Sequence, residues 1–91
     1  MTASDYLERV AGLPCVICLH KIGVKVYGVD VHHVGDASDR DDWAVASLCL
    51  EHHRGATGVH GLHRRGFHRF WKTTDIMLLA WTTELLSKER G

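Results

Sequence analysis

The residue types best suited to binding a metal occur in two short pairs. Two residues separate Cys15 from Cys18, and the same spacing separates Cys49 from His52. Thiolate and imidazole groups are the ligands of structural zinc sites, and two short segments commonly supply two ligands each. The spacing therefore predicts one tetrahedral zinc site, formed by Cys15, Cys18, Cys49 and His52.

The number of cysteines favours a metal over a disulfide. The chain has three cysteines, so they cannot all pair with one another. Residues 1–13 contain Asp5, Glu8 and Arg9 where a signal peptide would be apolar, which predicts a protein of the reducing cytoplasm. Buried cysteines without a metal are one alternative. Another is a zinc site whose fourth ligand is His20 or His53, because Cys-x-His and Cys-x-x-x-His spacings are also possible.

Histidine is unusually common in the chain, with eight residues, whereas Asn and Gln are absent. His32 and His33 are adjacent at the end of a valine-rich segment. Side chains alternate along a strand, so the two rings would face opposite sides unless the strand ends or bulges there. The pair predicts two roles, one ring binding a cation and the other accepting a proton from water. Two solvent-exposed histidines at a strand end are the alternative.

The elements that must position these residues can be read from the N-terminal half of the chain. Thr2 or Ser4 can cap a helix that Pro14 ends. A turn follows over residues 15–18. Residues 22–34 contain several valines divided by Gly28, which predicts two short strands or one bulged hairpin. The acidic residues 35–42 predict a loop, and residues 43–48 predict another short strand.

The C-terminal half is expected to be helical. A helix beginning near Cys49 would be interrupted by Gly55, Gly58 and Gly61. An amphipathic segment follows over residues 67–71, and the last helix is predicted over residues 74–88. Apolar residues at spacings of three and four predict the buried face of that last helix. Its members are Ile76, Leu79, Ala80, Thr83 and Leu86, widened by Leu78, Trp81 and Leu85.

Length and composition bound the class of protein. A chain of 91 residues and 10.2 kDa predicts a single domain, residues 1–91, because so short a chain buries only about 60–65 % of its unfolded surface. Hydrophobic residues make up 45 % of the chain and charged residues 24 %, which excludes a disordered or collagen-like protein. No apolar run approaches the length of about 18–20 residues that a membrane span needs.

The net charge of zero conceals two halves of opposite sign. Acidic residues outnumber basic ones by eight to four in residues 1–51, and basic residues outnumber acidic ones by seven to three in residues 52–91. The basic half predicts contacts with a phosphate backbone, a solvated surface being the alternative. The candidate residues for DNA binding are Arg54, Arg64, Arg65, Arg69 and Lys72.

Together these segments resemble a known enzyme family. A strand ending in His-His, a loop, a second strand and a helix bearing Cys-x-x-His-His are similar to the HNH, or ββα-metal, endonuclease motif, in its zinc-bound branch. More narrowly, the chain resembles the phage recombination-nuclease family of RecA-dependent HNH nucleases over residues 14–83. The residues that carry the resemblance are the runs 31–34 (VHHV), 48–54 (LCLEHHR) and 58–61 (GVHG), with Phe67 ahead of a leucine-rich helix.

The resemblance implies a role for each matched residue. His33 would be the general base, and His32 and His53 would bind a catalytic divalent cation, which is Mg²⁺, Mn²⁺, Ni²⁺ or Zn²⁺. Many ββα-metal sites take a third ligand one turn later, but Thr57 stands there, so His60 is the expected third ligand, with His63 as the substitute. The Asn of the motif is absent, and Asp42, or otherwise Asp41, is expected to hold the base in its place.

The resemblance also implies a fold and an activity. The expected fold is α+β, a small zinc-bound ββα-metal core with an N-terminal helix and one or two C-terminal helices. The expected activity is metal-dependent nicking of DNA with weak sequence preference. A recombinase or another phage protein would direct the enzyme to its target in the cytoplasm of a bacterial host. The alternatives are a non-catalytic zinc module that binds DNA or protein, and a hydrolase of nucleotides or small phosphoesters.

Overall fold

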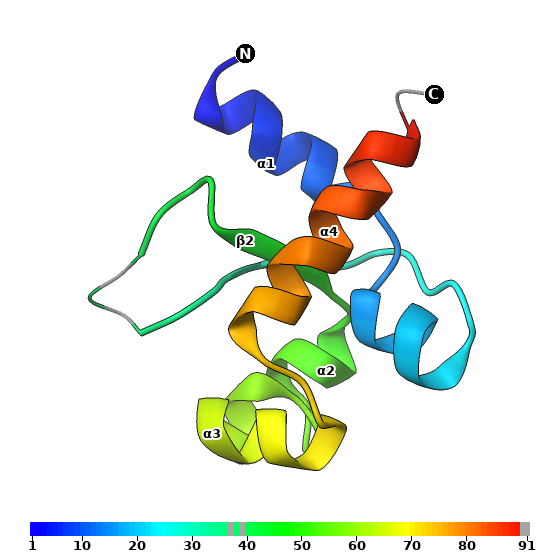
Figure 1. The fold of residues 1–91 in the computed structure, drawn as a ribbon, viewed down its shortest axis with the longest axis vertical. Coiled ribbons are helices and arrows are strands. Elements are labelled where there is room, and N and C mark those ends of the chain that lie inside the picture. Colours follow the sequence, from blue (N-terminus) through cyan, green and yellow to red (C-terminus); the bar gives the residue numbers. More distant parts are fainter. Residues whose placement is uncertain (37, 39, 90–91) are drawn as a thin grey trace.

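A two-stranded sheet with helices packed around it forms this small α+β protein (Figure 1). The computed structural model describes residues 1–36, 38 and 40–89. Along the chain the elements are α1 (Ala3–Ala11), the π-helical turn η1 (Cys18–Ile22), β1 (Asp30–His33), β2 (Val45–Leu48), α2 (Leu50–Arg54), α3 (Val59–Trp71) and α4 (Asp75–Glu89). In the described part of the chain, no helix is both long and apolar enough to cross a membrane.

The first helix begins where the sequence predicts. The Asp5 backbone N–H donates to the Thr2 hydroxyl oxygen at 3.1 Å, and the Thr2 backbone N–H donates to the Asp5 carboxylate at 3.0 Å. These reciprocal bonds satisfy two N–H groups that a helix start leaves without partners. Val10, on the inner face of α1, is fully buried. Thr2 is therefore the cap, and α1 ends at Ala11, ahead of Pro14.

The prediction of two strands or a bulged hairpin within residues 22–34 is wrong. Only β1 is a strand there, and it pairs antiparallel with β2, so that His32 lies opposite Ala46 and His33 opposite Val45. Gly23 and Gly28 adopt positive φ angles of 85° and 76°, which break an extended run. The segment between them is held by a partner outside it, because the backbone N–H of Cys15 donates to the Val26 carbonyl at 2.8 Å.

Glycines shape the passage from α2 to α3, although one of them does not interrupt a helix. Gly55 ends α2 and Gly58 precedes α3, as expected. Gly61 instead lies inside α3. A Cβ atom at Gly58 would overlap the backbone at Glu51, and one at Gly61 would overlap the Gly55 carbonyl. The glycines therefore allow the two helices to pack closely.

The face of α4 that packs inward matches the predicted one only in part, since Leu78 and Leu86 are buried as expected. Leu78, Thr82 and Leu86 are buried at spacings of four, whereas Ile76 is 77 % exposed. The Thr82 hydroxyl donates to the Leu78 carbonyl at 2.9 Å, which allows a polar residue in the core. Ile76 lies in the first turn of α4 and belongs to neither apolar cluster.

Two adjoining apolar clusters hold these elements together. The larger surrounds the cysteines and includes Ile17, Leu48, Phe67 and Leu78, and the smaller joins α1, β2 and α4. Leu85 packs against both clusters. In the β1–β2–α2 unit, α1 and α4 therefore pack against the strands, and α3 packs against α2.

A strained backbone at His63 leads to a stability prediction. His63 has φ 63° and ψ 162°, a region that glycine adopts readily, and strain there costs about 1–3 kcal/mol for other residues. The side chain is exposed, so His63→Gly removes the strain with little loss of packing. Glycine also gives the unfolded chain more conformational entropy, which offsets part of this effect. We therefore expect the free energy of unfolding to rise by about 1 kcal/mol, or the Tm by about 4–8 °C. Thermal unfolding followed by circular dichroism measures the change. His63→Ala keeps the strain and should give no gain, and a His63→Gly variant less stable than His63→Ala would contradict the prediction.

Candidate metal centre and histidine cavity

The four residues of the two short pairs form one buried cluster. Cys15 precedes η1, Cys18 begins it, Cys49 precedes the first turn of α2, and His52 lies within α2. Their ligand atoms all lie within 4.8 Å of one another. Packing brings this about, because β2 leads directly into Cys49 and shares an apolar cluster with the segment that carries Cys15 and Cys18. The Ser47 hydroxyl, which donates to the Pro14 carbonyl at 2.8 Å, joins the two parts.

The spacing of the ligand atoms fits a tetrahedral zinc ion. Bonds of about 2.3 Å to sulfur and about 2.0 Å to nitrogen imply about 3.8 Å between two sulfurs and about 3.5 Å between sulfur and nitrogen. The Cys18 and Cys49 sulfurs are 3.8 Å apart. His52 Nδ1 lies 3.2 Å from the Cys49 sulfur, 3.4 Å from that of Cys18 and 3.7 Å from that of Cys15. The cluster thus has both the donor set and the dimensions of a structural zinc site.

The surroundings of the cluster also suit a cation. Burial raises the pKa of the Cys15 and Cys18 thiols and lowers the pKa of His52. Thiolates in so apolar a place need a positive charge beside them, which a bound metal supplies. The backbone N–H of Cys18 already donates to the Cys15 sulfur at 3.4 Å. The Trp71 ring covers His52 edge-on, with 4.8 Å between the ring centres.

The two alternative fourth ligands lie elsewhere. The His20 ring stacks on Trp81, with ring centres 4.1 Å apart, on an exposed part of η1. His53 follows His52 on α2, and its Nδ1 contacts the Asp30 carboxylate at 2.9 Å. Neither ring belongs to the cysteine cluster. His52 is therefore the histidine of the Cys3His set.

A second group of histidines surrounds an open cavity of about 480 Å³. His32 and His33 enter it from β1, His53 from α2 and His60 from α3, and Asp36 and Arg40 complete its polar wall. The His53 ring centre lies 5.2 Å from that of His32 and 4.6 Å from that of His60. The adjacent rings of His32 and His33 both reach the cavity because β1 ends at His33.

His32 is held in the form that a metal ligand requires. Burial, followed by the nearby charge of His53, lowers the pKa of His32 to about 4. The ring is therefore neutral at pH 7, with a lone pair on one nitrogen. A neutral ring can bind a cation without first losing a proton.

His33 has a carboxylate partner. Its Nε2 lies 2.8 Å from Asp42 Oδ1. An ionised carboxylate can only accept a hydrogen bond, so Nε2 is the donor, and in the neutral form of the ring Nδ1 has the lone pair. Asp41 has a different contact, since its carboxylate accepts from the Trp43 backbone N–H at 2.8 Å. Asp42 is thus the carboxylate that contacts His33, and its role in holding a base stays a prediction.

Two other residues considered for the cation site lie outside the cavity wall. His63 is exposed at the kink of α3 and does not line the cavity. The Thr57 hydroxyl donates to Glu51 at 2.6 Å, and the Thr57 backbone N–H donates to the same oxygen at 3.0 Å. Of the two expected third ligands, only His60 lies beside His53.

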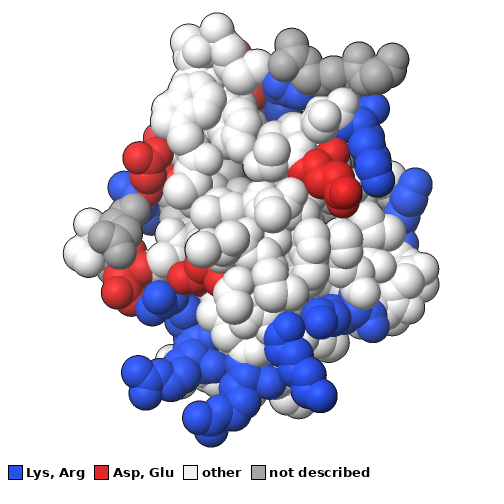
Figure 2. All heavy atoms as spheres, in the orientation of Figure 1, with Lys and Arg blue, Asp and Glu red and all other residues white. Residues whose placement is uncertain are grey.

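Lys and Arg side chains gather at the end of the molecule that α3 occupies (Figure 2).

Two of the five predicted DNA-binding residues already have carboxylate partners. Arg54 donates from Nε and Nη2 to Asp30 at 2.7 and 3.0 Å. These contacts, followed by that of His53, lower the pKa of Asp30 to about 2, so its carboxylate is ionised.

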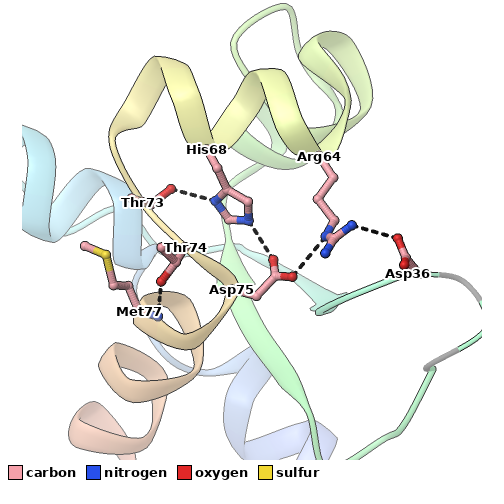
Figure 3. Close-up of polar contacts among 7 residues, drawn as sticks. All are labelled: Asp36, Arg64, His68, Thr73, Thr74, Asp75 and Met77. Carbon is pink, nitrogen blue, oxygen red and sulfur yellow. Dashed lines mark hydrogen bonds and ion pairs between the residues drawn. The ribbon is translucent and has the colours of Figure 1, made fainter.

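Arg64 is the second of these residues, and Figure 3 shows it between two carboxylates. It donates from Nε to Asp75 at 2.9 Å and from Nη1 to Asp36 at 2.7 Å. Asp75 also contacts His68 Nε2 at 2.6 Å. Burial alone would raise the pKa of Asp75, but the contacts with His68 and Arg64 outweigh it and lower the pKa. This network ties α3, the start of α4 and the loop after β1 together beside the cavity.

Sequence reasoning named Asp42 as the partner of His33, but it missed Asp30 as the partner of His53 and Asp75 as the partner of His68. Asp30 and His32 are two residues apart in one strand, so period-two alternation places them on the same face, and this signal could have indicated Asp30. Arg40 and Asp36 lie in the acidic loop, where no periodicity marks them. From the sequence, Asp75 is indicated only as an acidic residue in the first turn of a helix, and nothing indicates its contact with a histidine.

Comparisons with protein-family models, with curated proteins and with solved structures found no match to this chain. The functional argument therefore depends on the residues and their geometry.

Proposed function

We propose that this protein is a metal-dependent DNA endonuclease of the HNH type, which nicks DNA with weak sequence preference. One observation carries the proposal: His33, paired with Asp42, shares a cavity with three histidines that come from β1, α2 and α3. The order β1–β2–α2 and the neighbouring Cys3His cluster are in keeping with a zinc-bound ββα-metal unit.

The reaction needs few groups. In the proposed mechanism water attacks the phosphorus atom, its proton passes to Nδ1 of His33, and the bond from phosphorus to the 3′ oxygen breaks. The products are a 5′-phosphate and a 3′-hydroxyl that takes its proton from solvent. Asp42 holds the His33 ring with Nδ1 unprotonated. His32, His53 and His60 would bind the catalytic cation, which when bound supplies Lewis-acid stabilisation of the phosphate charge.

Contacts with DNA would come chiefly from α3 and its end. Arg65, Arg69 and Lys72 are exposed there, and such contacts position a backbone without reading its sequence. Arg54 and Arg64 would have to leave their carboxylate partners before they could contact a phosphate. We therefore expect them to contribute less to the DNA-binding affinity. Targeting by a recombinase or another phage protein, in a bacterial cytoplasm, belongs to the same proposal.

Nicking of supercoiled plasmid tests the proposed activity. Zinc-loaded protein, freed of loosely bound metal, is incubated with plasmid and added Mg²⁺, Mn²⁺, Ni²⁺ or no metal. We expect open-circular product only with added cation. Three imidazoles favour the softer ions over Mg²⁺, so Mn²⁺ or Ni²⁺ should give the faster reaction. Absence of nicking with every cation, by protein shown to be folded and zinc-loaded, would overturn the proposal.

A non-catalytic zinc module that binds DNA or protein is the second candidate. The observation in its favour is that, among residues 1–36, 38 and 40–89, only the Cys3His cluster brings three or more ligand atoms close enough to hold a metal as the side chains stand. Retarded migration of plasmid fragments without any cleavage would support this candidate over the nuclease.

His60→Ala tests the third cation ligand. We expect the variant to bind Mn²⁺ at least about 10-fold more weakly. Even the loss of a residue that only hydrogen-bonds to a metal ligand lowers metal affinity by about 10–100-fold. Its zinc content should not change, because His60 lies outside the Cys3His cluster. Isothermal titration calorimetry measures the affinity, and His63→Gly is the matched control on the same helix. A loss of Mn²⁺ affinity in the control, with none in His60→Ala, would assign the ligand to His63.

A further inference from the structure

Asp30 joins a cavity histidine to an arginine. Asp30 is the first residue of β1, opposite Leu48 of β2, so its backbone is held by the strand pairing. Its Oδ2 accepts from His53 Nδ1 at 2.9 Å and from Arg54 Nε at 2.7 Å, while Oδ1 accepts from Arg54 Nη2 at 3.0 Å. The Asp30 side chain is 23 % exposed and that of His53 is 15 % exposed. The three groups form a continuous chain from the surface to the cavity.

This chain of contacts determines which nitrogen of His53 carries the hydrogen. An ionised carboxylate has no hydrogen to donate, so Nδ1 of His53 must be the donor. A neutral ring then has its lone pair on Nε2, on the other side of the ring from Asp30. The His32 and His60 rings lie beside His53, and all three line the cavity.

Arg54 prevents the carboxylate from turning away. Its two nitrogens engage both oxygens of Asp30, and a paired contact of this kind fixes the plane of the carboxylate as well as its position. Arg54 is adjacent to His53 on α2, so the same helix turn carries both the ring and the group that holds its partner.

We propose that Asp30 and Arg54 are positioning residues that hold His53 in its Nδ1–H form, with Nε2 available to a cation in the histidine cavity. This inference depends on the proposed function in taking His53 as a cation ligand, but it does not depend on cleavage of DNA. It gives Arg54 a role different from the phosphate contact that the sequence predicts.

The tautomer of His53 is the first measurement. Long-range ¹H–¹⁵N correlation spectra at a pH where the ring is neutral distinguish Nδ1–H from Nε2–H. We expect wild-type His53 to be a single Nδ1–H form and Asp30→Ala to show a mixture of both forms. Asp30→Asn is the near-isosteric second variant, in case Asp30→Ala does not fold, and it should also show a mixture because an amide can accept or donate. A single Nδ1–H form in the folded variants would overturn the inference.

The affinity for Mn²⁺ alone is the second measurement. Loss of Asp30 should weaken binding by about 10–100-fold, and Arg54→Ala should weaken it by less, with partial recovery in Arg54→Lys. Arg65→Ala is the matched control, and neither its affinity nor its His53 tautomer should change. An equal loss in Arg65→Ala, or absence of Mn²⁺ binding by the wild type, would overturn the inference. A wild type that binds Mn²⁺ and shows the Nδ1–H form but nicks no plasmid would overturn the proposed function alone.

Discussion

Cys15→Ala is expected to lose zinc and to be largely unfolded at 25 °C. A structural zinc contributes about 10–16 kcal/mol of apparent binding free energy, whereas a small domain is stable by only about 5–15 kcal/mol in total. Cys15 is fully buried within the larger apolar cluster, so the remaining thiols and His52 would be left together without their cation. Circular dichroism and zinc analysis of the purified variant measure the two effects.

Val16→Ala is the matched control for this variant. Val16 is the next residue and is equally buried, but it has no ligand atom. Its replacement creates a small cavity and should leave a folded protein that contains one zinc ion per chain. Wild-type protein without zinc, or a Cys15→Ala variant that melts at the wild-type temperature, would show that the Cys3His cluster is not a structural zinc site.

His33→Ala is expected to reduce the rate of plasmid nicking by about 10²–10⁴-fold, the usual effect of losing a general base. The ring is proposed to take a proton from the attacking water through Nδ1, while Asp42 holds Nε2 at 2.8 Å. The zinc content and the Tm should change little, because His33 lies at the end of β1, outside the Cys3His cluster. Initial rates of open-circle formation with Mn²⁺ measure the effect.

His20→Ala is the control for histidine loss, since His20 stacks on Trp81 at the surface, away from the cavity. It should nick plasmid at the wild-type rate. A folded His33→Ala protein with undiminished activity would exclude His33 as the base and direct attention to His32 or His63.

Features that depend on neighbours in sequence could be predicted well. The sequence limited the α1 cap to Thr2 or Ser4, because a cap bonds to residues only three positions away, as Thr2 does to Asp5. The two pairs of zinc ligands are equally local, because each pair fits within one turn of chain. Their joining into one cluster followed from the chemistry of zinc, which needs four ligands. The first helix, β2 and the C-terminal helices followed from the same local patterns, and the resemblance to the ββα-metal motif implied the α+β class.

Features that depend on distant partners could not be predicted. On α4 the sequence indicated Leu78 and Leu86 but not Thr82, because the face that packs inward depends on where β2 and α1 lie. Residues 23–29 look like a strand by composition, but the backbone bond of Val26 is made to Cys15 rather than to a second strand of a local hairpin.

The histidine site was also predictable only in part. The resemblance to the HNH motif indicated which histidines would bind a cation and that Asp42 would contact His33, but other partners lie far away in sequence. Asp30 and His53 are 23 residues apart, and Asp36 and Arg64 are 28 apart. His52 was the predicted zinc ligand, but His53 remained an alternative because the two residues are adjacent on one short helix. Packing of α2 against the sheet resolves the choice, turning His52 to the cysteines and His53 to Asp30. Such pairings depend on how the loops close and how the helices pack, and neither can be predicted from a local pattern of residues.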